Sequence, residues 1–160
     1  LKMPVLDFTE MSEAHTASGE QDSFEMFARD LLAHLGYRIV GNPNRGADGG
    51  KDLIAEERRV GVGGESIIRW LVSCKHKAHS GNSVRPADEP NIMDRVYSNE
   101  CQGFLGFYST LPSSGLTTTI EGLKHKLEAQ VFDKEIIEKV EALCEEEMRE
   151  LGYSFYSELY

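Results

Sequence analysis

Apolar residues recur along the first third of the chain with a helical period and then with an alternating one. Over residues 18–35 the large apolar side chains fall at i, i+3, i+7, i+8 and i+11, which predicts an amphipathic helix. Gly36 directly follows this pattern and is typical of a helix C-terminus. Next come a short strand at 37–40, a turn-rich loop, and two apolar runs, KDLIAEER and ESIIRWLVSCKH, around VGVGG. We interpret the two runs as a β-hairpin.

The second half of the chain continues this mixture of elements. A polar loop, KAHSGNSVRPADEP, leads to a predicted helix at 91–99 and a strand at 101–110. Two further helices are predicted over 116–130 and 133–151. The predicted inner side of the last helix consists of Ile136, Ile137, Val140, Leu143 and Met148. The order of helices and strands predicts an α/β fold with a mixed central β-sheet flanked by helices.

Length and composition fit one domain. With 160 residues and 40% apolar residues the chain can bury one core, and we expect a lead-in at 1–19 followed by one domain over 20–160. The ends of the sequence suggest a piece of a longer, multidomain protein. No apolar run reaches the roughly 18 residues of a membrane span. The three cysteines lie far apart, which favours a reducing, cytoplasmic setting over a disulfide scaffold.

Charge bears on the class of partner. The formal net charge is −10, and residues 131–160 hold nine acidic residues against three basic ones. A protein that binds nucleic acid on its own usually carries a basic surplus, because contacts to phosphates supply most of the non-specific affinity. The acidic balance therefore argues against a self-sufficient DNA-binding domain, but not against a nuclease module that other domains bring to DNA.

The stretch GADGGKD, residues 46–52, is the densest cluster of candidate chemistry. A phosphate-binding loop would need Ser or Thr after Lys51, where this chain has Asp52. A calcium-binding EF-hand loop is also a poor match, because its ligand spacing and closing glutamate are missing. The remaining interpretation is that Asp52 opens a hairpin strand and works at a catalytic site.

The partner strand supplies the other half of that site. It ends in Ser73-Cys74-Lys75, where alternation places Ser73 and Lys75 on one side and Cys74 on the other. We predict that Asp52 holds Mg²⁺, with Mn²⁺ as a substitute, and that Lys75 orients or deprotonates the attacking water. The Cys74 carbonyl is a candidate metal ligand, and Glu25 on the first helix could reach the metal through water.

These segments together resemble a known family. FEMFARDLLAHLGYRIV, GADGGKDLIAEE and WLVSCKHK are similar to the Mrr-type restriction endonuclease domain of the PD-(D/E)xK nuclease superfamily. The resemblance implies a restriction-endonuclease-like core and metal-dependent hydrolysis of DNA phosphodiesters. It assigns Asp52 to the strand-opening aspartate, Lys75 to the lysine of the E/Q-x-K motif, and Glu25 to the glutamate of helix one.

The chain departs from the family at one position. Ser73 stands where the family usually has Glu or Gln, and a serine would contact a metal weakly or through water. Two functions follow from this. The first is an endonuclease that acts as the effector of a defence or restriction system, with fused sensor or NTPase domains and a homodimer for double-strand cutting. The alternative is a catalytically inactive nuclease fold that binds DNA or mediates assembly.

The residues after Lys75 form a local basic cluster. His76, Lys77 and His79 follow the strand directly and are candidates for contacts to DNA phosphates. The pair His76 and His79 has no third zinc ligand nearby in the sequence, which disfavours a zinc site. The Cys74 thiol is expected on the apolar side of its strand, as a buried thiol and not a nucleophile.

Overall fold

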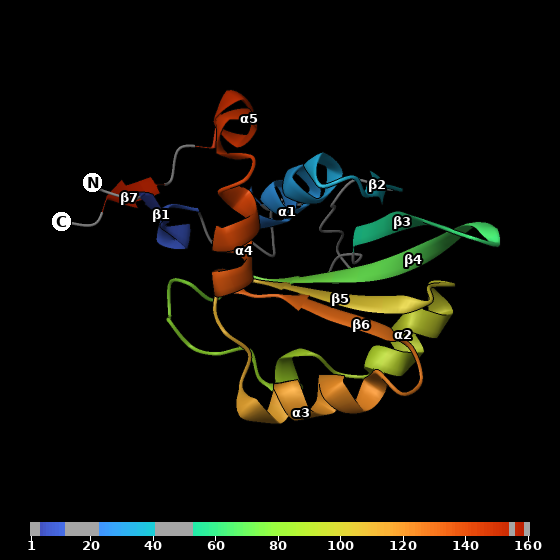
Figure 1. Cartoon of the computed structure of the whole chain (residues 1–160). Helices are drawn as coiled ribbons and strands as arrows, with labels where there is room; N and C mark the ends of the chain where they lie inside the picture. Colours follow the sequence, from blue (N-terminus) through green and yellow to red (C-terminus); the bar gives the residue numbers. More distant parts are fainter. Residues whose placement is uncertain (1–3, 12–22, 41–52, 154–155, 159–160) are drawn as a thin grey trace.

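The computed structural model describes residues 4–11, 23–40, 53–153 and 156–158 of the chain, and its layers surround one five-stranded sheet (Figure 1). In chain order its elements are β1 (Pro4–Leu6), the 3-10 helix η1 (Phe8–Glu10), α1 (Ser23–His34), β2 (Arg38–Ile39), β3 (Leu53–Gly61), β4 (Gly64–Lys75), the 3-10 helix η2 (Pro86–Asp88), α2 (Ile92–Ser98), β5 (Gly103–Tyr108), α3 (Ser114–Leu123), β6 (Glu128–Phe132), α4 (Lys134–Glu141), α5 (Glu145–Glu150) and β7 (Tyr156–Glu158).

The central sheet is mixed, as the sequence predicts. Its strand order is β2-β3-β4-β5-β6. The pairs β2/β3 and β3/β4 are antiparallel, whereas β4/β5 and β5/β6 are parallel. Parallel neighbours need a crossover connection, and α2 and α3 lie in these two crossovers. The sheet therefore joins an antiparallel hairpin to a parallel half along β4.

Helices cover both faces of the sheet, and each face has its own apolar core (Figure 1). Residues of α1 and α4 pack in the first core together with Trp70 and Val72 of β4. Residues of α2 and α3 pack in the second core together with Leu71 of β4. Successive side chains of β4 thus point alternately into the two cores, which confirms the predicted alternation.

Several predicted elements are present with shifted ends. Helix α1 is closed by a left-handed Gly36, whose φ is +104°, and by a 3.0 Å hydrogen bond from the Tyr37 amide to the Leu32 carbonyl. The hairpin of β3 and β4 pairs Gly61 with Gly64 around its turn. Helix α2 and strand β5 also lie inside the predicted ranges of 91–99 and 101–110.

The predicted helix over 116–130 is wrong at its C-terminal end. Helix α3 begins at Ser114, where the Ser113 side chain accepts a hydrogen bond from the Leu116 amide, and ends at Leu123. The next residues turn, and Glu128 to Phe132 form β6, the edge strand beside β5. Pairing with a buried neighbouring strand therefore outweighs the local helical pattern here.

The predicted helix over 133–151 is divided into α4 and α5, with a break at residues 142–144. Ile137 and Met148 are fully buried, as predicted for its inner side. Ile136 and Leu143 are exposed, Leu143 by 83%. The prediction is wrong for these two because Ile136 lies on the outer side of α4, next to the buried Ile137, and Leu143 lies in the break between the two helices.

Part of the N-terminal lead-in belongs to the fold. Strand β1 pairs with β7 in a separate two-stranded sheet, so the two ends of the chain lie side by side (Figure 1). Phe8 and Met11 are buried in the first core. Residues 4–11 therefore contribute a strand and two buried side chains to the fold.

Candidate active site

The C-terminal end of β4 presents two of the predicted site residues to one face of the sheet. Ser73 and Lys75 alternate with Cys74, whose side chain packs against the first core as predicted. Ser73 is fully buried, and the Lys75 side chain is 32% exposed. Asp52 lies outside the described residues. The first described residue of β3, Leu53, pairs with Val72, immediately before Ser73.

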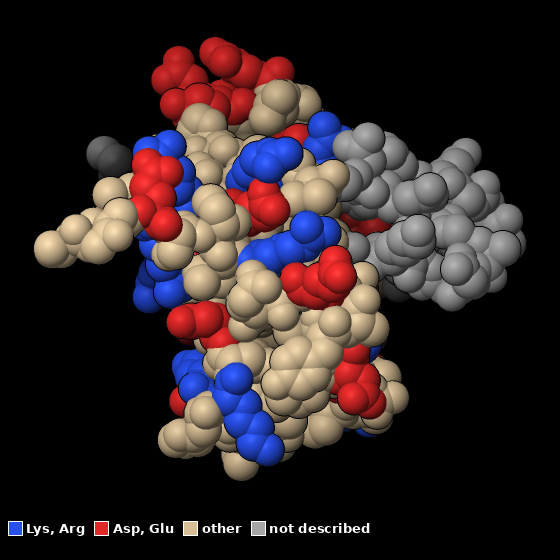
Figure 2. Space-filling view, turned by 90° about the vertical axis from the view of Figure 1, so that its right-hand side faces the viewer, with Lys and Arg blue, Asp and Glu red and all other residues tan. Residues whose placement is uncertain are grey.

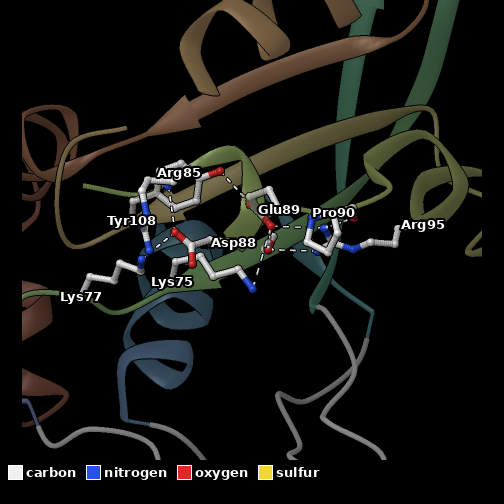
Figure 3. A network of polar contacts seen from close by, with 9 residues as sticks. Lys75, Lys77, Arg85, Asp88, Glu89, Pro90, Arg95 and Tyr108 are labelled. Carbon is white, nitrogen blue, oxygen red and sulfur yellow. Dashed lines mark hydrogen bonds and ion pairs between the residues drawn. The ribbon is translucent and has the colours of Figure 1, made fainter. Parts of the chain in front are cut away.

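A carboxylate that the sequence analysis did not single out lies between these side chains. Glu89 follows η2, and its side chain has no exposed surface. Its Oε1 accepts a 2.8 Å hydrogen bond from the Ser73 hydroxyl and lies 3.9 Å from the Lys75 Nζ. Its Oε2 accepts a 2.7 Å hydrogen bond from the Tyr108 hydroxyl on β5 (Figure 3).

Arg95 of α2 closes the network from the other side. Its Nη1 lies 3.2 Å from the Glu89 Oε1, and its Nη2 donates a 3.1 Å hydrogen bond to the Ser73 Oγ. The Arg95 side chain is 22% exposed, so the ion pair is largely removed from water. A buried carboxylate needs such partners, because an unpaired charge in the interior is strongly unfavourable.

The loop between β4 and α2 holds Glu89 in place by a tight local turn. The Arg85 amide donates a 2.8 Å hydrogen bond to the Asp88 carboxylate, and the Glu89 amide donates to the Pro86 carbonyl. Lys77, at the start of the loop, forms a 2.6 Å ion pair with Asp88 (Figure 3). Burial alone would raise the pKa of Asp88, but the hydrogen bonds from Lys77 and from the Arg85 amide hold it below its usual value.

The electrostatics keep the Tyr108 phenol in its donor form. Burial, and then the nearby Glu89 carboxylate, raise the pKa of Tyr108 far above its usual value. Tyr108 therefore remains protonated throughout the physiological range and can donate to Glu89. The site thus contains one carboxylate, two cationic side chains and two hydroxyl groups, which form a polar network on the face of the sheet that packs against the second core.

Glu25 lies on a different layer. It is partly buried on α1, the helix whose Phe24 and Phe27 pack into the first core. Ser73 and Lys75 belong to the alternate positions of β4, on the side of the second core. The contribution of Glu25 to a metal site therefore stays a prediction.

The three candidate DNA contacts are engaged within the chain. His76 stacks on Phe24 with ring centroids 4.8 Å apart, and its ring nitrogens lie near the Ser109 hydroxyl and the Met11 carbonyl. His79 also contacts the Met11 carbonyl, and Lys77 pairs with Asp88, as described above. These contacts link the end of β4 to the N-terminal segment. The prediction that the three residues contact DNA stays a prediction.

The donor chemistry beside Lys75 fits a hard divalent cation in part. Such cations take carboxylate and carbonyl oxygens, and Glu89 offers a buried carboxylate. Within the described residues no cluster of three His, Cys, Asp or Glu side chains is arranged to hold a metal ion. Asp52, which the sequence predicts as a metal ligand, lies outside the described ranges.

Charged residues of both signs are mixed on the face seen in Figure 2. The described residues also form ion pairs near the surface, such as Arg58 with Glu65 and Arg38 with Glu56. Acidic residues gather at the top of this view, where α5 carries Glu145, Glu146 and Glu147. No described helix is long and apolar enough to cross a membrane.

Comparison with solved structures identifies the fold. The fold is similar to that of the DNA modification-dependent restriction endonuclease AspBHI, with a TM-score of 0.59 at 14% identity, covering 76% of this chain and 31% of that one. The MspJI restriction endonuclease in complex with a 27-mer oligonucleotide gives a TM-score of 0.44 at 19% identity, covering 73% and 26%. The likeness to AspBHI shows a restriction-endonuclease-like fold. This chain spans about a third or less of the length of each of the two proteins.

The family assignment comes from the sequence. Residues 16–94 match the restriction endonuclease family of the Mrr catalytic type. Over residues 16–94 the chain therefore matches the Mrr-type restriction endonuclease family that the sequence motifs indicate. No curated protein matches the chain.

Proposed function

We propose that the chain is a metal-dependent endonuclease module that hydrolyses phosphodiester bonds of DNA. One observation carries the proposal. Lys75 lies at the end of β4, on the same face of the sheet as Ser73, and β4 pairs with β3, whose first described residue directly follows Asp52. The family match supports DNA cleavage as the reaction class.

Each residue has a defined task in this proposal. A bound Mg²⁺ or Mn²⁺ would polarise the phosphate and activate water. Asp52 would hold the cation. Lys75, with its partly exposed ammonium held near Glu89, would orient the attacking water and contact the scissile phosphate. The neutral, buried hydroxyl of Ser73 serves as a hydrogen-bonding link within the network.

We further propose that the module is the effector part of a defence or restriction protein. The chain spans 31% of the length of AspBHI, which leaves room for sensor or NTPase domains in a protein of that kind. The mixed charge of the face in Figure 2 fits a module that other domains deliver to DNA. Cutting both strands requires two such sites, so we expect a homodimer during double-strand cleavage.

One observation favours the second candidate, an inactive nuclease fold that binds DNA or mediates assembly. Ser73 replaces the Glu or Gln expected before x-Lys, and its hydroxyl both donates to Glu89 and accepts from Arg95. A nuclease fold that no longer binds a metal would keep these hydrogen bonds, and they would then serve only to stabilise the fold.

Plasmid cleavage in Mg²⁺, Mn²⁺ or EDTA separates the two candidates. Wild-type protein is compared with Asp52→Asn, which retains the shape of the side chain but removes its charge. The nuclease proposal expects nicked or linear plasmid with either cation, none in EDTA, and a loss of at least about 100-fold in the variant. Absence of cutting with either cation, together with retained DNA binding, would support the inactive module.

A further inference from the structure

We propose that Glu89 is a metal-binding carboxylate of this site and takes over the role that Ser73 cannot fill. The inference rests on the proposed function, since it names a ligand for the cation of that reaction. It is carried by the position of Glu89 against Ser73 and Lys75, two residues of the motif in which Ser73 replaces the usual Glu or Gln.

Burying the Glu89 carboxylate costs free energy, because a charged group is removed from water, and a purely structural role would have to offset this cost. Glu89 is 4% exposed, and Ser73, Ser109 and Glu141 are the other buried polar or charged residues in the described part of the chain. Replacing a buried ion pair by apolar side chains of similar volume is often neutral or stabilising. A charge retained at the end of β4, beside the lysine of the motif, is therefore better explained by chemistry than by packing.

The position of Glu89 allows its carboxylate to replace the one that a glutamate at position 73 would supply. A glutamate at position 73 would project its carboxylate beyond the place where the Ser73 hydroxyl ends. That hydroxyl lies 2.8 Å from the Glu89 Oε1, so the Glu89 carboxylate occupies the space directly ahead of the short serine. The sheet thus has an acid next to Lys75 although the strand itself does not supply it.

The carboxylate retains capacity for a cation. Two carboxylate oxygens offer about four lone-pair positions. Ser73 and Arg95 donate to Oε1, whereas Tyr108 donates to Oε2. Among the contacts of the described residues, Oε2 is the less occupied oxygen and is the one we assign to the metal. The Ser73 and Tyr108 hydroxyls would fix the orientation of the carboxylate, as hydrogen-bonded neighbours do for metal-ligating carboxylates.

Binding of Mn²⁺, followed by electron paramagnetic resonance of the free ion, tests the assignment without relying on cleavage. Wild-type protein is compared with Glu89→Gln, which retains the shape, and with Asp94→Asn, which removes an exposed acid of α2 next to Arg95. We expect Glu89→Gln to weaken Mn²⁺ binding by at least about tenfold. We expect Asp94→Asn to stay within about twofold of wild type, because it removes no metal ligand or ligand-orienting contact.

A double variant distinguishes a ligand from a packing residue. Ser73→Glu combined with Glu89→Ala moves the acid to the strand position and leaves space for it, and we expect it to recover most of the Mn²⁺ affinity that Glu89→Ala alone loses. Thermal unfolding without metal checks that each variant is folded. If Glu89→Gln does not fold, Glu89→Asp, which withdraws the carboxylate by one methylene, replaces it.

The outcomes separate this inference from the proposed function. If wild type binds Mn²⁺ and Asp52→Asn loses it, while folded Glu89→Gln binds as wild type does, the Glu89 assignment is overturned and the nuclease proposal stands. If wild-type protein binds no Mn²⁺ and cuts no DNA, both are overturned. A folded Glu89→Gln that binds weakly, with recovery in the double variant, supports both.

Discussion

The Ser73 hydroxyl donates a 2.8 Å hydrogen bond to the Glu89 carboxylate, and this contact joins the end of β4 to the loop before α2. The two residues are 16 positions apart in the sequence. The contact places an acid beside Lys75 on the face of the sheet that α2 covers.

Arg95→Met is expected to destabilise the domain strongly. Arg95 contacts both Glu89 and Ser73, and its removal leaves a buried carboxylate with less compensating charge. Losing one partner of a buried pair costs about 3 kcal/mol in free energy of unfolding. The matched control is Arg58→Met, which breaks an exposed pair with Glu65 and should cost less than about 1 kcal/mol. Urea unfolding measures both, and equal losses would contradict the buried network.

Gly106→Ala and Gly122→Ala are expected to act in opposite directions. A methyl group at Gly106 of β5 would collide with the Tyr108 phenol, which anchors Glu89. Overpacking of this kind costs about 1–3 kcal/mol. A methyl group at Gly122 of α3 meets no atom within 4 Å and should stabilise the helix by about 0.5–1 kcal/mol. Melting temperatures measure both changes, and a neutral Gly106→Ala would show that Tyr108 is not held as described.

Stability is expected to fall between about pH 5 and pH 8 because of Glu141. Burial, and then the neighbouring Glu145, raise the pKa of Glu141 to about 7 in the folded protein. The folded state thus binds more protons than the unfolded state between the normal carboxyl pKa and about 7, so the free energy of unfolding decreases as pH rises through that window.

Glu141→Gln removes this titration and tests its size. We expect the variant to lose less stability than wild type between pH 5 and pH 8, by on the order of 1 kcal/mol. Glu146→Gln, an exposed acid of α5, serves as the control and should follow the wild-type profile. Urea unfolding at the two pH values gives the comparison, and parallel profiles for wild type and Glu141→Gln would contradict the buried position of Glu141.

The elements with a clear local period could be predicted from the sequence. The apolar spacing and Gly36 locate α1, and the alternation of β3 and β4 gives both the hairpin and the faces of Ser73, Cys74 and Lys75. Strand β6 could not be predicted in this way, because its pairing with β5 is a tertiary effect and its residues extend a helical pattern. The pairing of β1 with β7 joins the two ends of the chain and leaves no local signal.

Glu89 was missed for a related reason. It lies in a polar loop, where acids are usually exposed, and only the packing of that loop against β4 and β5 buries it. One signal was nevertheless available. A serine in place of the motif's Glu or Gln indicates that an active site could take a polar ligand from another segment. The sequence alone does not say which of its many acids that segment carries.

Cleavage of supercoiled plasmid in Mg²⁺ by wild type, Lys75→Met and Lys124→Met tests the central claim most directly. Lys124 is an exposed lysine that follows α3 and pairs with Glu121, away from the site. We predict that Lys75→Met loses at least about 100-fold in cleavage rate while remaining folded, and that Lys124→Met cuts as wild type does. Equal cleavage by wild type and Lys75→Met would contradict the assignment of the active site to the end of β4.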